Sequence, residues 1–346
     1  MARRSAGFSL VELMVAVVVG LLGILAITSV FVTFEGNRRT TTGSGDAQEN
    51  ALVAMVSLER DLRMAGLGLV GLGCATVNGY NATLTPANVS FVPLPISITR
   101  DSPAAGSDMV TVMHSNSAFG NVPTSLTGPM ASSDDALNAA NADGFVRGDL
   151  ILISEGNKAC SLMQASDDAA KVGTNWTLSH APGAVDFNPP LGTNIFPAGG
   201  YATGAVVTNL GAMARREYFV QGSNLMMRDR NVPDSAVAPL NPVAVVDGVV
   251  AIRAQYGRDT NADGYIDVFD NTAPASPGEV VAVRIAVVAR SPQLEKTPVS
   301  PATLALWDGG TVANGGAIAL DATAQQYRYK VYQTTIPLRN VIWNNN

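Results

Sequence analysis

Histidine and cysteine are scarce in this chain, which contains two of each among 346 residues. His114 and His180 have no metal-binding spacing to each other or to the cysteines. The motif G-x-S-x-G, which positions the nucleophile of many hydrolases, is missing. The scarcity of such residues argues against an enzyme.

Charged residues are also few, at 14% of the chain, and the formal net charge is −6. The sequence has no run of basic residues, and an acidic chain of this kind is not typical of proteins whose main partner is a nucleic acid. Glycine and proline are plentiful, with 33 and 19 residues. The composition is typical of an exported protein built mainly from strands and loops.

One long apolar run stands out near the N-terminus, from Phe8 to Phe34, and Glu12 is its only charged residue. A helix needs about 20 apolar residues to span a bilayer, so the run is long enough. Arg3 and Arg4 precede it and Glu35 follows it. The positive-inside rule then predicts a cytoplasmic N-terminus, a single membrane pass and an extracytoplasmic remainder.

The residues alone leave other interpretations of this run open. A secretory signal has an apolar region of about 7–15 residues and then a small-residue cleavage site. The run here is longer and does not end in an A-x-A site, but Ala26 and Ser29 do not exclude cleavage there. A plain membrane anchor would carry Glu12 at a cost of roughly 2.5–3.5 kcal/mol. A small residue, Gly7, instead precedes the run.

The string GFSLVEL at residues 7–13 resembles the class III signal of type IV prepilins and type II secretion pseudopilins. The resemblance implies that a prepilin peptidase cleaves between Gly7 and Phe8 and that Phe8 is then N-methylated. It also implies that Glu12 pairs with the N-terminal ammonium of a neighbouring subunit inside a filament. A buried carboxylate is tolerated when an opposite charge and hydrogen bonds meet it.

Four further strings resemble minor pilins of the PilW type: RDLRMAG at 60–66, YFV to LMMR at 218–228, VDGV at 246–249 and TTIPLRN at 334–340. The resemblance implies a subunit that helps to start pilus assembly near the tip. Its implied partners are other minor and major pilins, the prepilin peptidase, the inner-membrane assembly platform and a tip adhesin. Two alternatives remain, a tip-displayed adhesin or adhesin-docking module and a J-type pseudopilin of type II secretion.

The apolar pattern predicts one long, interrupted helix from Phe8 to about Ala65. Apolar residues recur at three- and four-residue steps beyond the membrane, and Gly66 and Gly68 end the pattern. Residues 36–45 are poor helix formers, and we expect a bend or frayed turns there. The expected divisions are a leader (1–7), a membrane and filament-core helix (8–34), its amphipathic continuation (35–66) and a β-rich head (67–346).

Short apolar runs broken by turn residues predict an antiparallel β-sheet head, so that the fold class is α+β with a long N-terminal helix packed on the sheet. Long loop insertions are expected at 121–149 and 181–201. The string GLGLVG at 66–71 matches G-x-G-x-x-G but follows a helix, so it is interpreted as a helix stop and not as a dinucleotide site. The predicted strands are 109–113, 150–154, 205–210, 216–221, 249–256, 280–289 and 329–337.

The two cysteines, Cys74 and Cys160, both lie outside the predicted membrane segment. An oxidising compartment favours a disulfide between them, which would close a loop of about 86 residues. Sequence cannot show whether the two Cα atoms are close enough, so two separate buried thiols remain the alternative.

The segment 259–270 resembles a calcium-binding loop, because short oxygen-bearing side chains alternate before a glycine at Gly264. The last position usually holds Glu in such loops and holds Asp here, which shortens its reach. We expect Ca²⁺ as a cofactor that stabilises the head, and a solvated acidic turn is the alternative. The predicted ligands are Asp259, Asn261, Asp263, Tyr265 through its carbonyl, Asp267 and Asp270.

Overall fold

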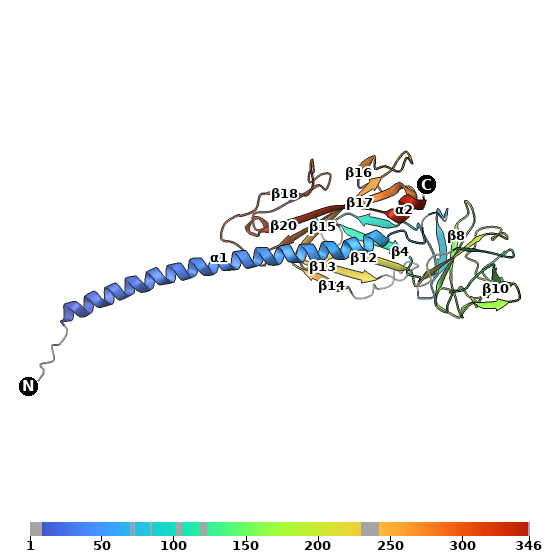
Figure 1. The fold of residues 1–346 in the computed structure, drawn as a ribbon, viewed down its shortest axis with the longest axis horizontal. Helices are drawn as coiled ribbons and strands as arrows, with labels where there is room; N and C mark the ends of the chain where they lie inside the picture. Colours follow the sequence, from blue (N-terminus) through green and yellow to red (C-terminus); the bar gives the residue numbers. More distant parts are fainter. Residues whose placement is uncertain are drawn as a thin grey trace, which may run out of the picture.

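The computed structural model describes residues 9–69, 71, 73–83, 85–101, 106–117, 123–229 and 242–344. The leader, the processing residues Gly7 and Phe8, and residues 121–122 of the expected loop lie outside these ranges. A long helix, α1 (Leu10–Met64), projects from one end of the molecule, and its C-terminal half lies along the β-rich head (Figure 1).

Helix α1 is continuous over 55 residues, so the interruption and the frayed turns expected at residues 36–45 are not found. Contacts with the head explain the difference. Gly43 lies against Gln293 so closely that a Cβ atom would overlap the Gln293 amide oxygen. Thr40 Oγ1 lies 3.2 Å from Glu295 Oε1, within hydrogen-bonding distance. Tertiary packing thus outweighs the low helix propensity of this segment.

Two sheets form the part of the head that packs on α1, and all their neighbouring strands are antiparallel. The five-stranded sheet has the order β14-β13-β12-β4-β3 and the four-stranded sheet the order β16-β15-β17-β20. Their bounds are β3 Ile96–Thr99, β4 Met109–His114, β12 Ala214–Gln221, β13 Asn224–Asp229, β14 Val243–Asp247, β15 Val249–Arg258, β16 Val268–Asp270, β17 Val280–Arg290 and β20 Tyr329–Pro337.

The main hydrophobic core lies between α1 and these two sheets. Leu58 and Leu62 of α1 are fully buried there with Ile252, Val283 and Ile285 of the four-stranded sheet. One face of β17 therefore packs into the main hydrophobic core. The alternate residues of β17, including Ala286 and Val288, belong to a smaller cluster on the outer face under the hairpin of β18 (Thr303–Ala305) and β19 (Ala317–Ala319).

A distal lobe, composed of β1, β2 and β5 to β11, lies beyond the end of α1 (Figure 1). Its six-stranded sheet has the order β2-β1-β8-β7-β11-β5, in which only the β1–β8 pair is parallel, and its three-stranded sheet has the order β6-β10-β9. The bounds are β1 Val77–Tyr80, β2 Asn88–Phe91, β5 Thr124–Ser125, β6 Leu137–Ala139, β7 Leu150–Ser154, β8 Cys160–Gln164, β9 Ala170–Val172, β10 Asn175–Leu178 and β11 Val206–Gly211.

The α+β class is confirmed, and the seven predicted strands are found as β4, β7, β11, β12, β15, β17 and β20, within two residues at each end. The loop expected at 121–149 is not purely a loop, because β5 and β6 lie within it and Leu137 and Ala139 are buried against the distal lobe. Short 3₁₀ turns η1 (Pro277–Glu279) and η2 (Ala324–Gln326) and a last helix, α2 (Arg339–Asn344), complete the chain.

Candidate functional site

The projecting half of α1 has no cover from the head. It is the only helix among the described residues that is long and apolar enough to cross a membrane. All its apolar side chains from Leu10 to Phe34 are exposed. The first and the last of them, Leu10 and Phe34, are each 75% exposed. In water such a surface would be strongly unfavourable, so its environment is a lipid bilayer or the helices of other subunits.

Glu12 lies in the first turn of this helix, in a capping box with Ser9. The backbone N–H of Ser9 donates to the Glu12 carboxylate at 3.2 Å, and the backbone N–H of Glu12 donates to Ser9 Oγ at 3.2 Å. The negative charge is also favoured by the positive end of the helix dipole. Glu12 therefore has a local structural role in addition to the subunit pairing predicted for it, which a single chain does not test.

At the other end of α1, Asp61 joins the helix to the five-stranded sheet. Asp61 is 3% exposed, and both of its carboxylate oxygens accept hydrogen bonds from Arg216 Nη1, at 3.1 and 3.0 Å. The Tyr218 hydroxyl donates to the same carboxylate at 2.7 Å. Burial and the hydrogen bond to Asp61 raise the pKa of Tyr218. This pairing is not predicted from the sequence, although Asp61 lies on the same helix face as Leu58 and Leu62.

The exit of the helix is held by two further contacts. Asn340 Nδ2 of α2 donates to the carbonyl oxygens of Met64 and Ala65, at 3.3 and 3.1 Å, and so caps the last turn. The backbone N–H of Gly66 donates to the carbonyl of Met113 in β4 at 2.9 Å. Helix α2 and the exit of α1 are thus fixed to each other.

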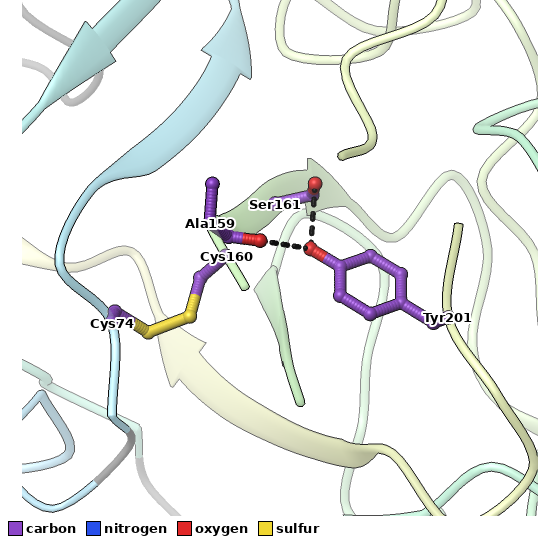
Figure 2. Close-up of a disulfide and its surroundings, with 5 residues drawn as sticks. All are labelled: Cys74, Ala159, Cys160, Ser161 and Tyr201. Atoms are coloured by element: carbon purple, nitrogen blue, oxygen red, sulfur yellow. Dashed lines mark hydrogen bonds between the residues drawn. A yellow bond between two sulfur atoms is a disulfide. The ribbon is translucent and has the colours of Figure 1, made fainter. Parts of the chain in front are cut away.

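The disulfide between Cys74 and Cys160 is confirmed, and it links the segment after the helix to the start of β8 in the distal lobe (Figure 2). The two Cα atoms are 5.5 Å apart, well within the range for a disulfide. Next to it, the Tyr201 hydroxyl lies 2.9 Å from both the Ala159 carbonyl and Ser161 Oγ. Burial raises the pKa of Tyr201.

The acidic loop between β15 and β16 orients its first side chains through backbone hydrogen bonds. Asp259, which is buried, accepts from the N–H groups of Asn261 at 3.3 Å, Asp263 at 3.2 Å and Gly264 at 2.7 Å. The Asp263 carboxylate accepts from the N–H of Tyr265 at 2.9 Å, and the Tyr265 side chain is exposed. Gly264 has a φ of 86°, which favours glycine and gives the predicted sharp turn.

Asp267 returns to the same cluster. The Asn261 amide nitrogen lies 3.2 Å from an oxygen of Asp263 and 3.4 Å from an oxygen of Asp267, so a positive dipole end faces both carboxylates. The hydroxyl and the backbone N–H of Thr260 also donate to Asp267, each at 2.7 Å, and these bonds lower the pKa of Asp267. The loop therefore brings together four of the predicted ligands, Asp259, Asn261, Asp263 and Asp267.

Asp270 is engaged elsewhere. Its carboxylate accepts hydrogen bonds from Arg258, with Arg258 Nε at 3.0 Å from one oxygen, and this contact lowers the pKa of Asp270. Arg258 also pairs with Glu279. In the described part of the chain, no group of three or more His, Cys, Asp or Glu side chains is arranged to hold a metal ion. The calcium site therefore stays a prediction, with Asp270 the least suited of its ligands.

Both histidines are buried in the head. His114 Nδ1 lies 2.9 Å from the carbonyl of Ser115, and His180 Nδ1 lies 3.2 Å from the carbonyl of Leu178. Each ring thus has a backbone partner and belongs to a different part of the fold, which fits a structural role.

Known families match both ends of the chain. Residues 2–28 match the Prokaryotic N-terminal methylation motif, and residues 216–340 match the family described as Type IV Pilus-assembly protein W. No curated protein matches the chain. The chain is similar to a solved structure, a type IV-like pilin, TTHA1219, from Thermus thermophilus, with 14% identity over 85% of this chain and 97% of that chain, at a TM-score of 0.37.

The two family matches include the string that carries Glu12 and three residues that contact the last turn of α1, namely Arg216, Tyr218 and Asn340. A pilus subunit of this kind is a structural component and does not belong to a known enzyme family. The chain thus combines a prepilin N-terminal methylation motif with a Type IV Pilus-assembly protein W domain, and these matches support a type IV pilus minor pilin of the PilW type.

Proposed function

We propose that this minor pilin helps to start pilus assembly and lies near the tip of the pilus with other minor pilins. The observation that supports this most directly is the surface of α1, because a second exposed apolar patch occurs on it beyond the membrane segment. Leu52, Val53 and Val56 are 51%, 46% and 57% exposed, whereas Ala51 and Ala54 of the same turns are buried in the head.

Polar and small residues 35–51 separate this exposed patch from the uncovered apolar surface of residues 10–34 on the same helix. Exposed apolar side chains on a helix of an extracytoplasmic subunit are stabilised when other helices cover them. The helices of other pilins are therefore the proposed partners of α1, first in the inner membrane and then in the filament. The head is proposed to be periplasmic before assembly and extracellular after it.

The N-terminal motif supports the proposed maturation by prepilin peptidase. Cleavage between Gly7 and Phe8 would leave Phe8 directly before the Ser9 cap of α1. The Glu12 carboxylate already accepts a hydrogen bond from the Ser9 backbone, so it is held at the very start of the mature helix. We propose that it pairs there with the N-terminal ammonium of a neighbouring subunit as the assembly platform adds pilins.

A deletion strain complemented with two variants tests the proposed function. Loss of surface pili on deletion, restored by the wild-type chain but not by Leu52→Glu with Val56→Glu, is the expected result. A matched variant with Val172→Glu changes an exposed valine of the distal lobe and should restore pili. Normal piliation with lost attachment would instead indicate a tip adhesin, and loss of exoprotein secretion alone would indicate a type II pseudopilin. Either result would contradict the proposal.

We also propose that the acidic loop binds Ca²⁺ through Asp259, Asn261, Asp263 and Asp267, with the Tyr265 carbonyl as a further ligand. Hard cations take six to eight oxygen ligands, which short Asp and Asn side chains can supply in a tight loop. Two of these carboxylates, those of Asp263 and Asp267, meet at the amide nitrogen of Asn261, and this contact supports the proposal. Because Asp270 is paired with Arg258, the site would be completed by water or would require that pair to open.

A further inference from the structure

A row of polar side chains crosses the outer face of the four-stranded sheet, on the side away from α1. Gln255 of β15 pairs in register with Arg284 of β17, and Arg284 pairs with Thr335 of β20. Their neighbours Val283 and Ile285 point to the main core, so this row lies on the opposite face. Arg284 is thus placed at the centre of the sheet by the strand pairing itself.

The Arg284 guanidinium is clamped between two aromatic rings. It lies 4.6 Å from the centre of the Phe269 ring and 4.5 Å from the centre of the Trp307 ring. Arg284 Nη2 donates to the amide oxygen of Gln255, and the Gln255 amide nitrogen donates to the carbonyl of Asn314 at 2.9 Å. Because the Gln255 amide nitrogen binds the Asn314 carbonyl, the amide oxygen of Gln255 is the end that faces Arg284. The two aromatic rings and this amide, all neutral, hold the guanidinium in one orientation.

The charge of Arg284 has no counter-ion among the described residues, where its contacts are the two rings and the Gln255 amide. This sets it apart from Arg216, Arg253 and Arg258, each of which pairs with two carboxylates. Burial lowers the pKa of Arg284, and the aromatic rings recover only part of the lost hydration. A carboxylate that came to this guanidinium would therefore gain a strong, charge-assisted partner.

A hollow of about 320 Å³ opens beside this guanidinium, lined by Arg284, Trp307, Asp308, Gln333, Thr334 and Thr335. Its volume is at the lower end of the range for small-molecule sites. We propose that this hollow binds the carboxylate of a small ligand, with Arg284 as its ionic partner and Gln333 and Thr335 as hydrogen-bonding partners. The proposal does not depend on the role of the chain in pilus assembly.

Asp308 gives the hollow a second charge. Asp308 is exposed, and within the described part of the chain it forms no ion pair with Arg284. A ligand that carries an ammonium as well as a carboxylate, as an amino acid does, would complement both charges. The hollow therefore favours small carboxylic acids, and the contribution of an ammonium can be measured separately.

Three compounds separate these contributions, and their binding to the detergent-solubilised full chain can be measured by ligand-observed NMR titration. N-acetylglycine carries a carboxylate alone, glycine carries both charges and N-acetylglycinamide carries neither. We expect saturable binding of N-acetylglycine and glycine but not of N-acetylglycinamide. Tighter binding of glycine than of N-acetylglycine, lost in Asp308→Asn, would extend the proposal to the ammonium.

Arg284→Gln should weaken binding of N-acetylglycine by about tenfold or more, because the charge-assisted bond is lost. The matched control is Arg290→Gln, which removes another ring-stacked arginine of the same strand, 4.2 Å from the Tyr327 ring centre, and should change binding by less than about twofold. If Arg284→Gln does not fold, Gln333→Ala with Thr335→Val leaves the clamp in place and should also weaken binding. Equal binding of all three compounds, no saturable binding of either acid, or wild-type binding by these variants would overturn the proposal and leave Arg284 a structural clamp.

Discussion

The carboxylate of Asp61, in the last turn of α1, accepts a 2.7 Å hydrogen bond from the hydroxyl of Tyr218 in β12. Arg216, two residues earlier on the same strand face, binds the same carboxylate. The long helix is therefore attached to the sheet by a buried polar cluster as well as by apolar packing. Removal of the carboxylate would leave a buried hydroxyl without its partner.

We expect Asp61→Ala to lower the free energy of unfolding of the head by about 2–4 kcal/mol. Tyr218→Phe should cost less, about 1 kcal/mol, because only one hydrogen bond is lost. Asp229→Ala removes the other, half-exposed partner of Arg216 and should change stability by less than about 1 kcal/mol. Urea unfolding of the full chain in detergent measures all three. Equal effects of Asp61→Ala and Asp229→Ala would show that the buried cluster does not stabilise the junction.

Gly7 is predicted to be the last residue of the leader. A larger side chain at this position would prevent the backbone from approaching the active site of the peptidase. The Gly7→Leu variant should therefore accumulate as an uncut, membrane-bound precursor. Immunoblotting by size detects the precursor, and N-terminal sequencing of the wild-type mature chain should begin at Phe8. A mature chain that begins at any other residue would contradict the predicted cleavage site.

Glu12→Ala is expected to be inserted and cleaved normally but to enter filaments poorly, because it loses the proposed pairing with a neighbouring ammonium. Glu35→Ala is the matched control, since Glu35 is also on α1 and forms only an exposed pair with Arg39. Quantification of the subunit in sheared pili, against the total in the cell, measures incorporation. Glu12→Gln, which keeps a hydrogen-bonding oxygen for the Ser9 backbone, should still assemble poorly, and wild-type incorporation of this variant would refute the charge pairing.

Removal of the disulfide by Cys74→Ser with Cys160→Ser should lower the free energy of unfolding by about 4–5 kcal/mol, since an 86-residue loop is no longer closed in the unfolded state. Alkylation of the denatured, unreduced wild-type chain should detect no free thiol. Reduction of the wild-type protein should reproduce the stability of the double variant. A double variant as stable as the oxidised wild type would show that the disulfide does not stabilise the fold.

Calcium at millimolar concentration, the range of extracellular calcium modules, should raise the melting temperature of the full chain. Asp259→Ala with Asp263→Ala should abolish this increase, whereas Asp143→Ala, at an exposed site of the distal lobe, should keep it. Asp270→Asn distinguishes the two roles open to Asp270. If Asp270 only pairs with Arg258, the variant melts lower but still responds to calcium. An unchanged melting temperature of the wild-type chain with and without calcium would exclude the site.

The longer elements of the fold could be predicted from sequence because their patterns are periodic. α1 follows from its apolar run and its three- and four-residue repeat, and β15, β17 and β20 from their long β-branched stretches. The short strands of the distal lobe could not, because β5, β6 and β9 have two or three residues and form only through pairing with distant strands.

The sites show the same division. The cysteine pair and the acidic string are visible as residue types and spacing, and the disulfide is found as predicted. The cluster of Asp61 with Arg216 and the clamp of Arg284 between Phe269 and Trp307 join residues that are far apart in the chain. The pairing of Asp270 with Arg258 was also beyond the sequence, because a loop motif does not show which cation a carboxylate faces.

The disulfide has a mechanical consequence for a subunit in a filament under tension. A pulling force that enters through β8 and is resisted at α1 reaches Cys74, ten residues beyond the end of the helix, through a covalent bond. The segment between the cysteines, which are separated by 86 positions, is thereby removed from the load path. At about 3.3–3.6 Å per residue, unravelling of this segment would otherwise lengthen the chain by roughly 300 Å. The oxidised subunit therefore transmits tension between β8 and α1 as a short, inextensible link, and the segment between the two cysteines cannot be pulled out between these points.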